Sequence, residues 1–312
     1  MTIVTVASWE DRFLLGFKRM LAEEQVRHAY VFYYEEFAKR TEKARSSVAR
    51  LCSRARIKIE ILPLKYENPV QSWTAARNFC EGRRTQIRHV LLDISTMPRD
   101  LIWILLSFFR ELNVHGTYVY NMPKGYHSKW LSRDPGDPRL IYKLGGESKF
   151  GLKTVLLVVT GFDLERAQQL IDFFDPTETI LAVQSGPQYD NLRMNASRHR
   201  EFFRGSPDIT SFDVDAYSSD HGYSKLQKAI AARVGNGNIV MASLGPKLSA
   251  MALFRIHMSH PQVGLTYTPS KDYNLKYSHG IGNTIRGDLF CAPSYSGSPL
   301  PSSTKPLVPG KL

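Results

Sequence analysis

Short apolar runs alternate with longer amphipathic segments over most of the chain. A continuous apolar run between turn residues is typical of a buried strand, and apolar residues that recur every three or four positions are typical of a helix. Strands that alternate with helices predict crossover connections and a mostly parallel, doubly wound α/β sheet. The expected strands cover 2–8, 28–34, 57–64, 89–95, 116–122, 154–161, 179–185, 209–217, 238–245 and 263–269. The expected helices cover 11–24, 39–56, 70–82, 100–112, 164–174, 191–203, 222–234 and 247–259.

Local features of the first half recur in the second half at a nearly constant spacing. The segment STMPR at 95–99 matches SLGPK at 243–247, and KGYHSKW at 124–130 matches KDYNLKY at 271–277. The spacing between equivalent residues is 148 positions for the first pair of segments (247 − 99) and 147 for the second (273 − 126). A period of this length predicts an internal duplication of a whole domain, not a solenoid repeat.

The predicted fold is therefore two tandem Rossmann-like domains followed by a tail. The first half covers 1–132, a Gly/Pro-rich connector covers 133–151, and the second half covers 152–285. Residues 286–312 are rich in Pro and Ser and lack periodicity, which predicts a flexible extension.

Composition and charge narrow the class of protein. With 312 residues, 43% hydrophobic and 22% charged, the chain is long enough for two globular domains. Three widely spaced cysteines form neither a disulfide framework nor a zinc pattern, which favours a reducing, cytoplasmic compartment. No apolar run approaches the roughly 20 residues that a bilayer needs, and the first residues lack the pattern of a signal peptide. We therefore expect no membrane partner.

A net charge of +12 and an isoelectric point near 9.6 favour polyanionic partners such as nucleotides or nucleic acid. Much of this charge lies in the helical segment Lys39–Arg56. Two interpretations stay open for this segment, a nucleic-acid footprint and a solvated helix face.

The turn at 95–99 follows a strand and precedes a helix, where parallel sheets bind ligands and where helix N-termini attract anions. Ser95 and Thr96 offer hydroxyl groups, and Arg99 offers a fixed charge able to bind phosphate. The alternative is plain capping of the helix by Thr96, with Pro98 in its first turn.

The matching turn supplies the same chemistry in the second half. Ser243 offers a hydroxyl or an N-cap, Gly245 permits close approach of the backbone to a ligand, and Lys247 offers a cation. Capping alone does not explain a cation after the proline in both turns, so we predict an anion-binding site that uses both.

The loops after the first strand of each half also match, as ASWEDR and TGFDLER. Trp9 and Phe162 are candidates to stack on a base, and Arg12 and Arg166 are candidates to bind phosphate. The alternatives are ordinary packing of the aromatic rings and ion pairs with Glu10 and Asp163.

A third pair of segments adds Lys124 and Tyr126 in the first half and Lys271, Tyr273 and Asn274 in the second. Loops that concentrate polar and aromatic side chains are typical of binding sites, although a polar connection without a role remains the alternative.

Motifs of catalysis are absent from the sequence. It contains no P-loop, no GxGxxG after a strand, no GxSxG, no HExxH and no paired CxxC. Asp93 is the most plausible general base, but its counterpart is Ala242, so we predict no catalytic residue, assign no cofactor and do not expect an enzyme.

The strand-end segments SLGPKLSAMALF and DISTMPRDLIWILL, with the opening VLLVVTGF of the second half, resemble the ligand motifs of CARF domains. One chain with two such halves is similar to SAVED domains, and the resemblance covers most of residues 1–285. It implies a sensor of cyclic oligonucleotides in a prokaryotic antiviral defence system, and it adds Ser8 and Gly161 as candidates in the first loops. Pro246 stands where the family turn has its second glycine, and we expect no effector domain in this sequence.

These observations predict a cytoplasmic module that binds a nucleotide or cyclic oligonucleotide in a basic cleft between its halves. A partner protein is expected to carry the output. Two alternatives remain: a phosphodiesterase-type enzyme acting on such a ligand, and a structural nucleic-acid-binding subunit of a defence complex.

Overall fold

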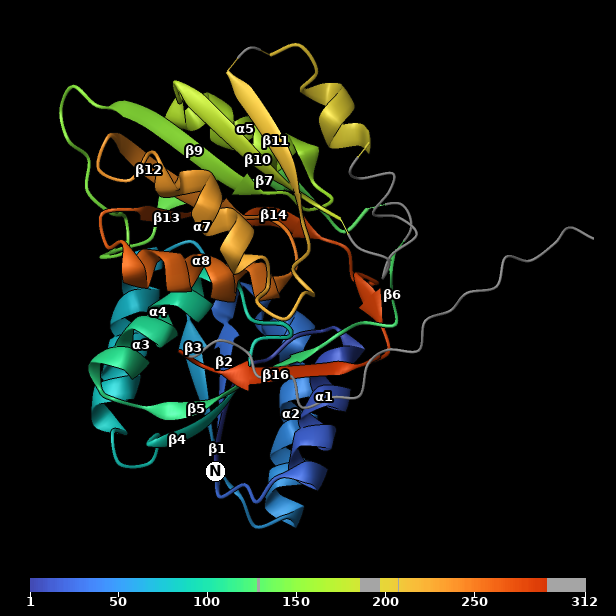
Figure 1. The fold of residues 1–312 in the computed structure, drawn as a ribbon. Helices are drawn as coiled ribbons and strands as arrows, with labels where there is room; N and C mark the ends of the chain where they lie inside the picture. Colours follow the sequence, from blue (N-terminus) through green and yellow to red (C-terminus); the bar gives the residue numbers. More distant parts are fainter. Residues whose placement is uncertain (128–129, 186–196, 207, 291–312) are drawn as a thin grey trace, which may run out of the picture.

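The structure is a computed structural model that describes residues 1–127, 130–185, 197–206 and 208–290. It has two α/β halves, each built on a six-stranded sheet, and they lie one above the other in Figure 1. The predicted α/β fold class with two Rossmann-like units is confirmed. In the described part of the chain no helix is long and apolar enough to span a bilayer.

The first sheet has the order β16-β5-β4-β1-β2-β3, in which β1 to β5 run parallel. Its parallel strands are β1 (Thr2–Val6), β2 (His28–Tyr34), β3 (Lys58–Leu64), β4 (His89–Asp93) and β5 (His115–Asn121). Its helices are α1 (Asp11–Glu23), the 3₁₀ turn η1 (Glu35–Phe37), α2 (Ala38–Arg54), α3 (Pro69–Gly82) and α4 (Arg99–Glu111).

The second sheet repeats this arrangement in the order β11-β10-β9-β12-β13-β8. Its parallel strands are β9 (Lys153–Val159), β10 (Glu178–Gln184), β11 (Ile209–Val214), β12 (Gly237–Ser243) and β13 (Gly264–Tyr267). Its helices are α5 (Leu164–Phe174), α7 (Tyr223–Ala231) and α8 (Lys247–Ser259). The helix expected over 191–203 falls partly outside the described residues. The shared strand order agrees with the predicted duplication, which itself stays a prediction.

Each sheet ends in an antiparallel strand that comes from outside its own half. Strand β8 (Arg139–Leu140), in the connector, pairs with β13, and β16 (Thr284–Asp288) returns to pair with β5 of the first half. The boundary predicted at 285/286 therefore differs from the structure, since it cuts through a strand of the first sheet. The remainder of the predicted tail, 291–312, lies outside the described residues.

Short ribbons join the two halves beside these sheets. Strand β7 (Ser132–Pro135) pairs with β14 (Ser270–Tyr273), and β6 (Gly125–Tyr126) pairs with β15 (Ser278–His279). The two predicted Lys-x-Tyr segments are thus held near each other by backbone hydrogen bonds.

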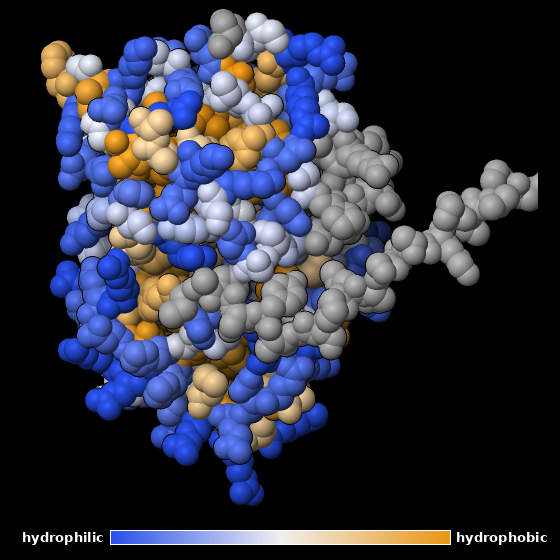
Figure 2. All heavy atoms as spheres, in the orientation of Figure 1, coloured by the Kyte–Doolittle hydropathy of each residue, from blue (hydrophilic) through white to orange (hydrophobic). Residues whose placement is uncertain are grey.

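A hydrophobic core shared by both halves holds them together. Helices α1 and α2 cover one face of the first sheet, and α5 covers the outer face of the second. The inner faces carry α3 and α4 in the first half and α7 and α8 in the second, and these share a single apolar core. The indole nitrogen of Trp103 on α4 donates to the carbonyl oxygen of Ala250 on α8 at 2.8 Å. Hydrophilic residues cover most of the face drawn in Figure 2.

Candidate functional site

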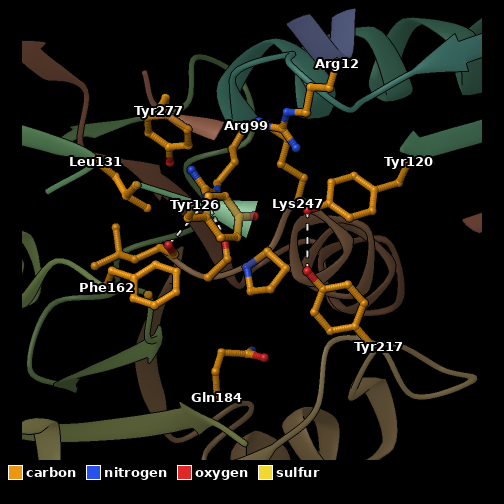
Figure 3. A pocket seen from close by; sticks show the side chains of 14 residues that line it. Arg12, Arg99, Tyr120, Tyr126, Leu131, Phe162, Gln184, Tyr217, Lys247 and Tyr277 are labelled. Carbon is orange, nitrogen blue, oxygen red and sulfur yellow. Dashed lines mark hydrogen bonds between the residues drawn. The ribbon is translucent and has the colours of Figure 1, made fainter. Parts of the chain in front are cut away.

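The carboxyl ends of the strands in both sheets meet between the halves and enclose two adjoining chambers. Arg99, Lys247 and Tyr277 line both of them. Chamber 1 is further lined by Arg12, Tyr120, Tyr126, Leu131, Gly161, Phe162, Gln184, Tyr217, Leu244, Gly245 and Pro246 (Figure 3). Chamber 2 is further lined by Val6, Ala7, Ser8, Trp9, Glu10, Tyr34, Phe37, Thr41, Tyr66, Thr96, Met97, Pro98, Arg166, Tyr267 and Tyr273.

Arg99, the first residue of α4, reaches across to the turn of the second half. Its Nε donates to the hydroxyl of Ser243 at 3.2 Å, and its Nη2 donates to the carbonyl oxygens of Leu244, at 3.2 Å, and Gly245. Burial and the nearby Arg166 lower the pKa of Arg99. No carboxylate of the described residues forms an ion pair with this guanidinium.

Lys247, the first residue of α8, makes the reciprocal contact. Its Nζ donates to the carbonyl oxygen of Ser95 in the first half at 2.9 Å. Burial lowers the pKa of Lys247 well below its usual value, and Arg12 and Arg99 lower it further, whereas Glu10 acts in the opposite direction. Each cation thus contacts the turn of the opposite half. Reciprocal contacts of this kind are the pattern that an approximate twofold axis produces.

The hydroxyl groups of the two turns form hydrogen bonds with other residues of the protein. Ser95 Oγ accepts hydrogen bonds from the backbone and side-chain amides of Asn121, and Thr96 Oγ1 donates to the carbonyl oxygen of Val6. Ser243 Oγ contacts Ser249 Oγ at 2.8 Å as well as Arg99. Neither Ser95 nor Ser243 lines a chamber, so the prediction that their hydroxyl groups face a ligand is not supported by their positions.

The capping alternative is also wrong. Pro98 and Pro246 are themselves the N-cap residues of α4 and α8, with extended backbone angles, and no side chain caps either helix. The cations Arg99 and Lys247 therefore occupy the first helical position, where the N-terminal dipole disfavours a positive charge. A ligand anion at this place interacts favourably with the cation and with the helix end.

In the first loop, Arg12 forms the predicted alternative, an ion pair with Glu10. Its Nε lies 2.9 Å from Glu10 Oε2, and the residue is 1% exposed. Burial favours the neutral form of Glu10, but Arg12, Lys247 and the hydroxyl of Ser278 outweigh it and lower the pKa of the carboxyl. The Nη1 of Arg12 has no hydrogen-bond partner among the described residues.

Arg166 plays the matching part in chamber 2. Its Nη2 donates to the carbonyl oxygen of Thr268, and its Nε lies 4.0 Å from Asp163 Oδ2. Burial lowers the pKa of Arg166, but nearby tyrosines and Asp163 raise it more. The residues that line the two chambers include four cationic side chains and one carboxylate, that of Glu10. The cations are Arg12, Arg99, Arg166 and Lys247.

Aromatic side chains form the remaining walls. The ring of Trp9 lies 5.6 Å from Phe37 and 5.8 Å from Tyr273, and its indole nitrogen donates to the carbonyl oxygen of Asn274 at 3.4 Å. In chamber 1 the ring of Tyr126 lies 5.6 Å from Phe162. The predicted aromatic candidates therefore pack against other rings and also line the chambers.

The structure brings most of the predicted residues to the chambers and leaves a few outside. Lys124 and Lys271 are exposed, and Asn274 is buried with its amide nitrogen donating to the carbonyl oxygen of Trp130 at 3.0 Å. These three residues do not line a chamber. Those that do are Ser8, Trp9, Arg12, Thr96, Arg99, Tyr126, Gly161, Phe162, Arg166, Gly245, Lys247 and Tyr273.

Sequence reasoning missed several residues of the chamber walls. Tyr34 and Gln184 end the second strand of each sheet, and Tyr120 and Tyr267 lie at the carboxyl ends of β5 and β13. The rule that ligands bind at the carboxyl ends of parallel strands applies to these positions as well, so a search of every strand end finds them.

Asp93 has a structural role. It is fully buried, and its carboxylate accepts hydrogen bonds from the hydroxyl of Thr5 at 3.1 Å and from the backbone nitrogen of Ser95 at 3.0 Å. Burial raises the pKa of Asp93. Among the described residues, no cluster of three or more His, Cys, Asp and Glu side chains is arranged to hold a metal ion.

Comparison with known proteins adds little to this geometry. No protein-family model matches the sequence, and no curated protein matches it significantly. Among solved structures, the cytoplasmic domain of a prokaryotic cation chloride cotransporter aligns with 88% of this chain and 98% of its own, at 9% identity and a TM-score of 0.29. A periplasmic sugar-binding protein from Pseudomonas fluorescens aligns with 83% of this chain and 65% of its own, at 12% identity and a TM-score of 0.22. Both TM-scores are too low to indicate function.

Proposed function

We propose that this protein binds a nucleotide or cyclic oligonucleotide in the two chambers between its halves. The observation that carries the proposal is the crossing of Arg99 and Lys247. Both cations lie deep between the halves, keep some surface open to the chambers, and are held by carbonyl and hydroxyl oxygens without a carboxylate partner among the described residues. Partly buried cations that form no direct ion pair with a carboxylate favour the entry of an anion.

A phosphate group is a better hydrogen-bond acceptor for Arg99 and Lys247 than the neutral carbonyl and hydroxyl oxygens that they contact now. A phosphate group offers charged oxygens to the guanidinium and ammonium groups, and hydrogen bonds to ionised acceptors are about twice as strong as those between neutral groups. The tyrosine and tryptophan side chains around the cations offer faces on which bases stack. The resemblance to CARF and SAVED domains points to the same ligand class.

The hydrogen bonds of Arg99 and Lys247 also link ligand binding to the arrangement of the two halves. Arg99 and Lys247 hold the turns of opposite halves together, so a phosphate that recruits both cations removes these hydrogen bonds and shifts the arrangement of the halves. A partner protein that carries the output of a defence system would read this shift. The proposed role is sensing, and hydrolysis of the ligand is the alternative that chromatography of the bound ligand tests.

The proposal is tested by thermal shift and calorimetry with a panel of cyclic di-, tri- and tetranucleotides. A ligand at 100 times its Kd is expected to stabilise the protein by about 2.7 kcal/mol. Arg99→Met and Lys247→Met are expected to remove the effect. Lys124→Met and Lys271→Met remove the same charge outside the chambers and are expected to keep it. A panel without any response, or equal responses of all four variants, would refute the proposal.

A further inference from the structure

Several residues in the wall of one chamber have a counterpart in the wall of the other. Tyr120 and Tyr126 of chamber 1 correspond to Tyr267 and Tyr273 of chamber 2, each at an offset of 147 positions. Arg12 of chamber 1 likewise corresponds to Arg166 of chamber 2, at an offset of 154 positions. The two chambers therefore carry similar rings and cations.

The correspondence breaks at the last residue of the second strand. Tyr34 ends β2 in chamber 2, and Gln184 ends β10 in chamber 1, at an offset of 150 positions. Gln184 is 2% exposed, and its Oε1 accepts a hydrogen bond from the backbone nitrogen of Ala216 at 3.2 Å. Its Nε2 has no hydrogen-bond partner among the described residues.

The contact with Ala216 settles the orientation of the amide. Because Oε1 accepts from a backbone N–H, the other end of the amide can only be the NH₂ group, which is a donor. In the view of Figure 3 the Gln184 side chain lies across the chamber from Arg12, with Phe162 and Tyr217 on its flanks. A buried donor without a partner is unfavourable, so chamber 1 favours a group that brings an acceptor to this place.

Chamber 2 offers different chemistry at the equivalent end. The ring of Tyr34 lies 5.3 Å from that of Tyr66, which lies 5.1 Å from Phe37 and forms a 2.7 Å hydrogen bond with the hydroxyl of Tyr273. No amide side chain is among its described lining residues. This end of chamber 2 therefore offers mainly aromatic faces.

We infer that the two chambers bind two chemically different rings of one ligand, and that Gln184 selects a ring with a carbonyl acceptor in chamber 1. The inference rests on the proposed function. A ring carbonyl, as in guanine, receives the Gln184 N–H, whereas an exocyclic amine at that position, as in adenine, places donor against donor. A site that hydrogen-bonds one such group discriminates strongly against a ligand that lacks it.

The test compares three probes by calorimetry: cyclic di-AMP, cyclic di-GMP and mixed cyclic GMP–AMP. The wild-type protein is expected to bind the mixed ligand at least about tenfold more tightly than cyclic di-AMP, which offers no ring carbonyl. Gln184→Glu keeps an acceptor for Ala216 but replaces the donor, and is expected to abolish this preference. Gln184→Met is a second variant, of similar volume and without the donor. Tyr34→Phe, in chamber 2, is the control and is expected to keep the preference.

Two kinds of failure are distinguishable. If cyclic di-AMP binds as tightly as the mixed ligand, or if folded Gln184 variants keep the wild-type preference, the inference is wrong and the proposed function stands. If none of the three probes binds, or if Arg99→Met leaves their binding unchanged, the proposed function fails for this ligand class and the inference fails with it.

Discussion

The ammonium nitrogen of Lys247 lies 2.9 Å from the carbonyl oxygen of Ser95, a residue of the opposite half. Arg99 makes the matching contact in the other direction, so each turn holds the cation of its counterpart. These contacts bridge the halves at the point where we propose that the ligand binds. They link binding to the packing of the two halves.

Lys247→Met is expected to make the protein more stable while it removes ligand binding. Burial and two neighbouring arginines disfavour the charge of Lys247 in the folded state, and replacing such a group with an apolar one stabilises by about 1 kcal/mol or more. Denaturant unfolding measures the change. Lys124→Met, at an exposed position, is the control and is expected to change stability by less than about 0.5 kcal/mol. A destabilised Lys247→Met would show that its bond to Ser95 outweighs the burial of the charge.

Anion binding is expected to take up protons through Lys247. Because the pKa of Lys247 is lowered in the ligand-free protein, its amine is more readily neutral there, and a phosphate beside it raises that pKa again. The affinity should therefore fall as the pH rises. Calorimetry in two buffers with different ionisation enthalpies measures the proton uptake. Lys247→Arg, which stays protonated, is expected to bind with less proton uptake, and equal uptake in both proteins would contradict the assignment.

Gly161→Ala is expected to disturb chamber 1 and to destabilise the protein. A Cβ at this position would lie 2.0 Å from the carbonyl oxygen of Leu244, so the backbone of the turn must move. Overpacking of this kind costs about 1–3 kcal/mol. Gly82→Ala, at the end of α3, is the control, since its Cβ meets nothing within 4 Å. Thermal unfolding measures the stability of both variants, and Gly161→Ala is expected to have the lower unfolding temperature. Similar unfolding temperatures would argue against close packing at Gly161.

The sequence predicted the architecture well because buried parallel strands and amphipathic helices leave strong periodic patterns. Strand β16 was not predicted, since a short polar edge strand has the same pattern as a loop. The matching turns correctly placed Arg99 and Lys247 in one region. Their crossed contacts follow from how α4 and α8 pack, and packing between distant segments leaves no local signal.

The side-chain direction of small polar residues was the weakest part of the prediction. Ser95 and Ser243 were expected to face a ligand, but the turn directs their hydroxyl groups into the protein. Gln184 shows the opposite case. It ends an apolar strand and matches no motif, and only the contact with Ala216 reveals that its NH₂ group is left without a partner among the described residues.

His221 is expected to make the stability of the protein fall in mild acid. Its Nδ1 lies 3.0 Å from the carbonyl oxygen of Ala216 and must carry the proton, so its Nε2 accepts from the hydroxyl of Tyr118, at 2.5 Å, on β5 of the first half. Burial is the main cause that lowers the pKa of His221 to about 4. A second proton on the ring removes the acceptor for the Tyr118 hydroxyl and places a positive charge in this buried position.

The sign of the pH dependence follows from that shift. The folded-state pKa lies below the unfolded value of about 6.5, so the stabilisation is complete above pH 6.5 and is lost as the pH falls toward 4. The expected loss is about 3 kcal/mol, measured by denaturant unfolding at several pH values. His221→Asn does not titrate and tolerates the left-handed backbone at this position, where φ is 58°. Its stability should change less than that of the wild type over the same range. Parallel curves for the two proteins would show that His221 is not the titrating group.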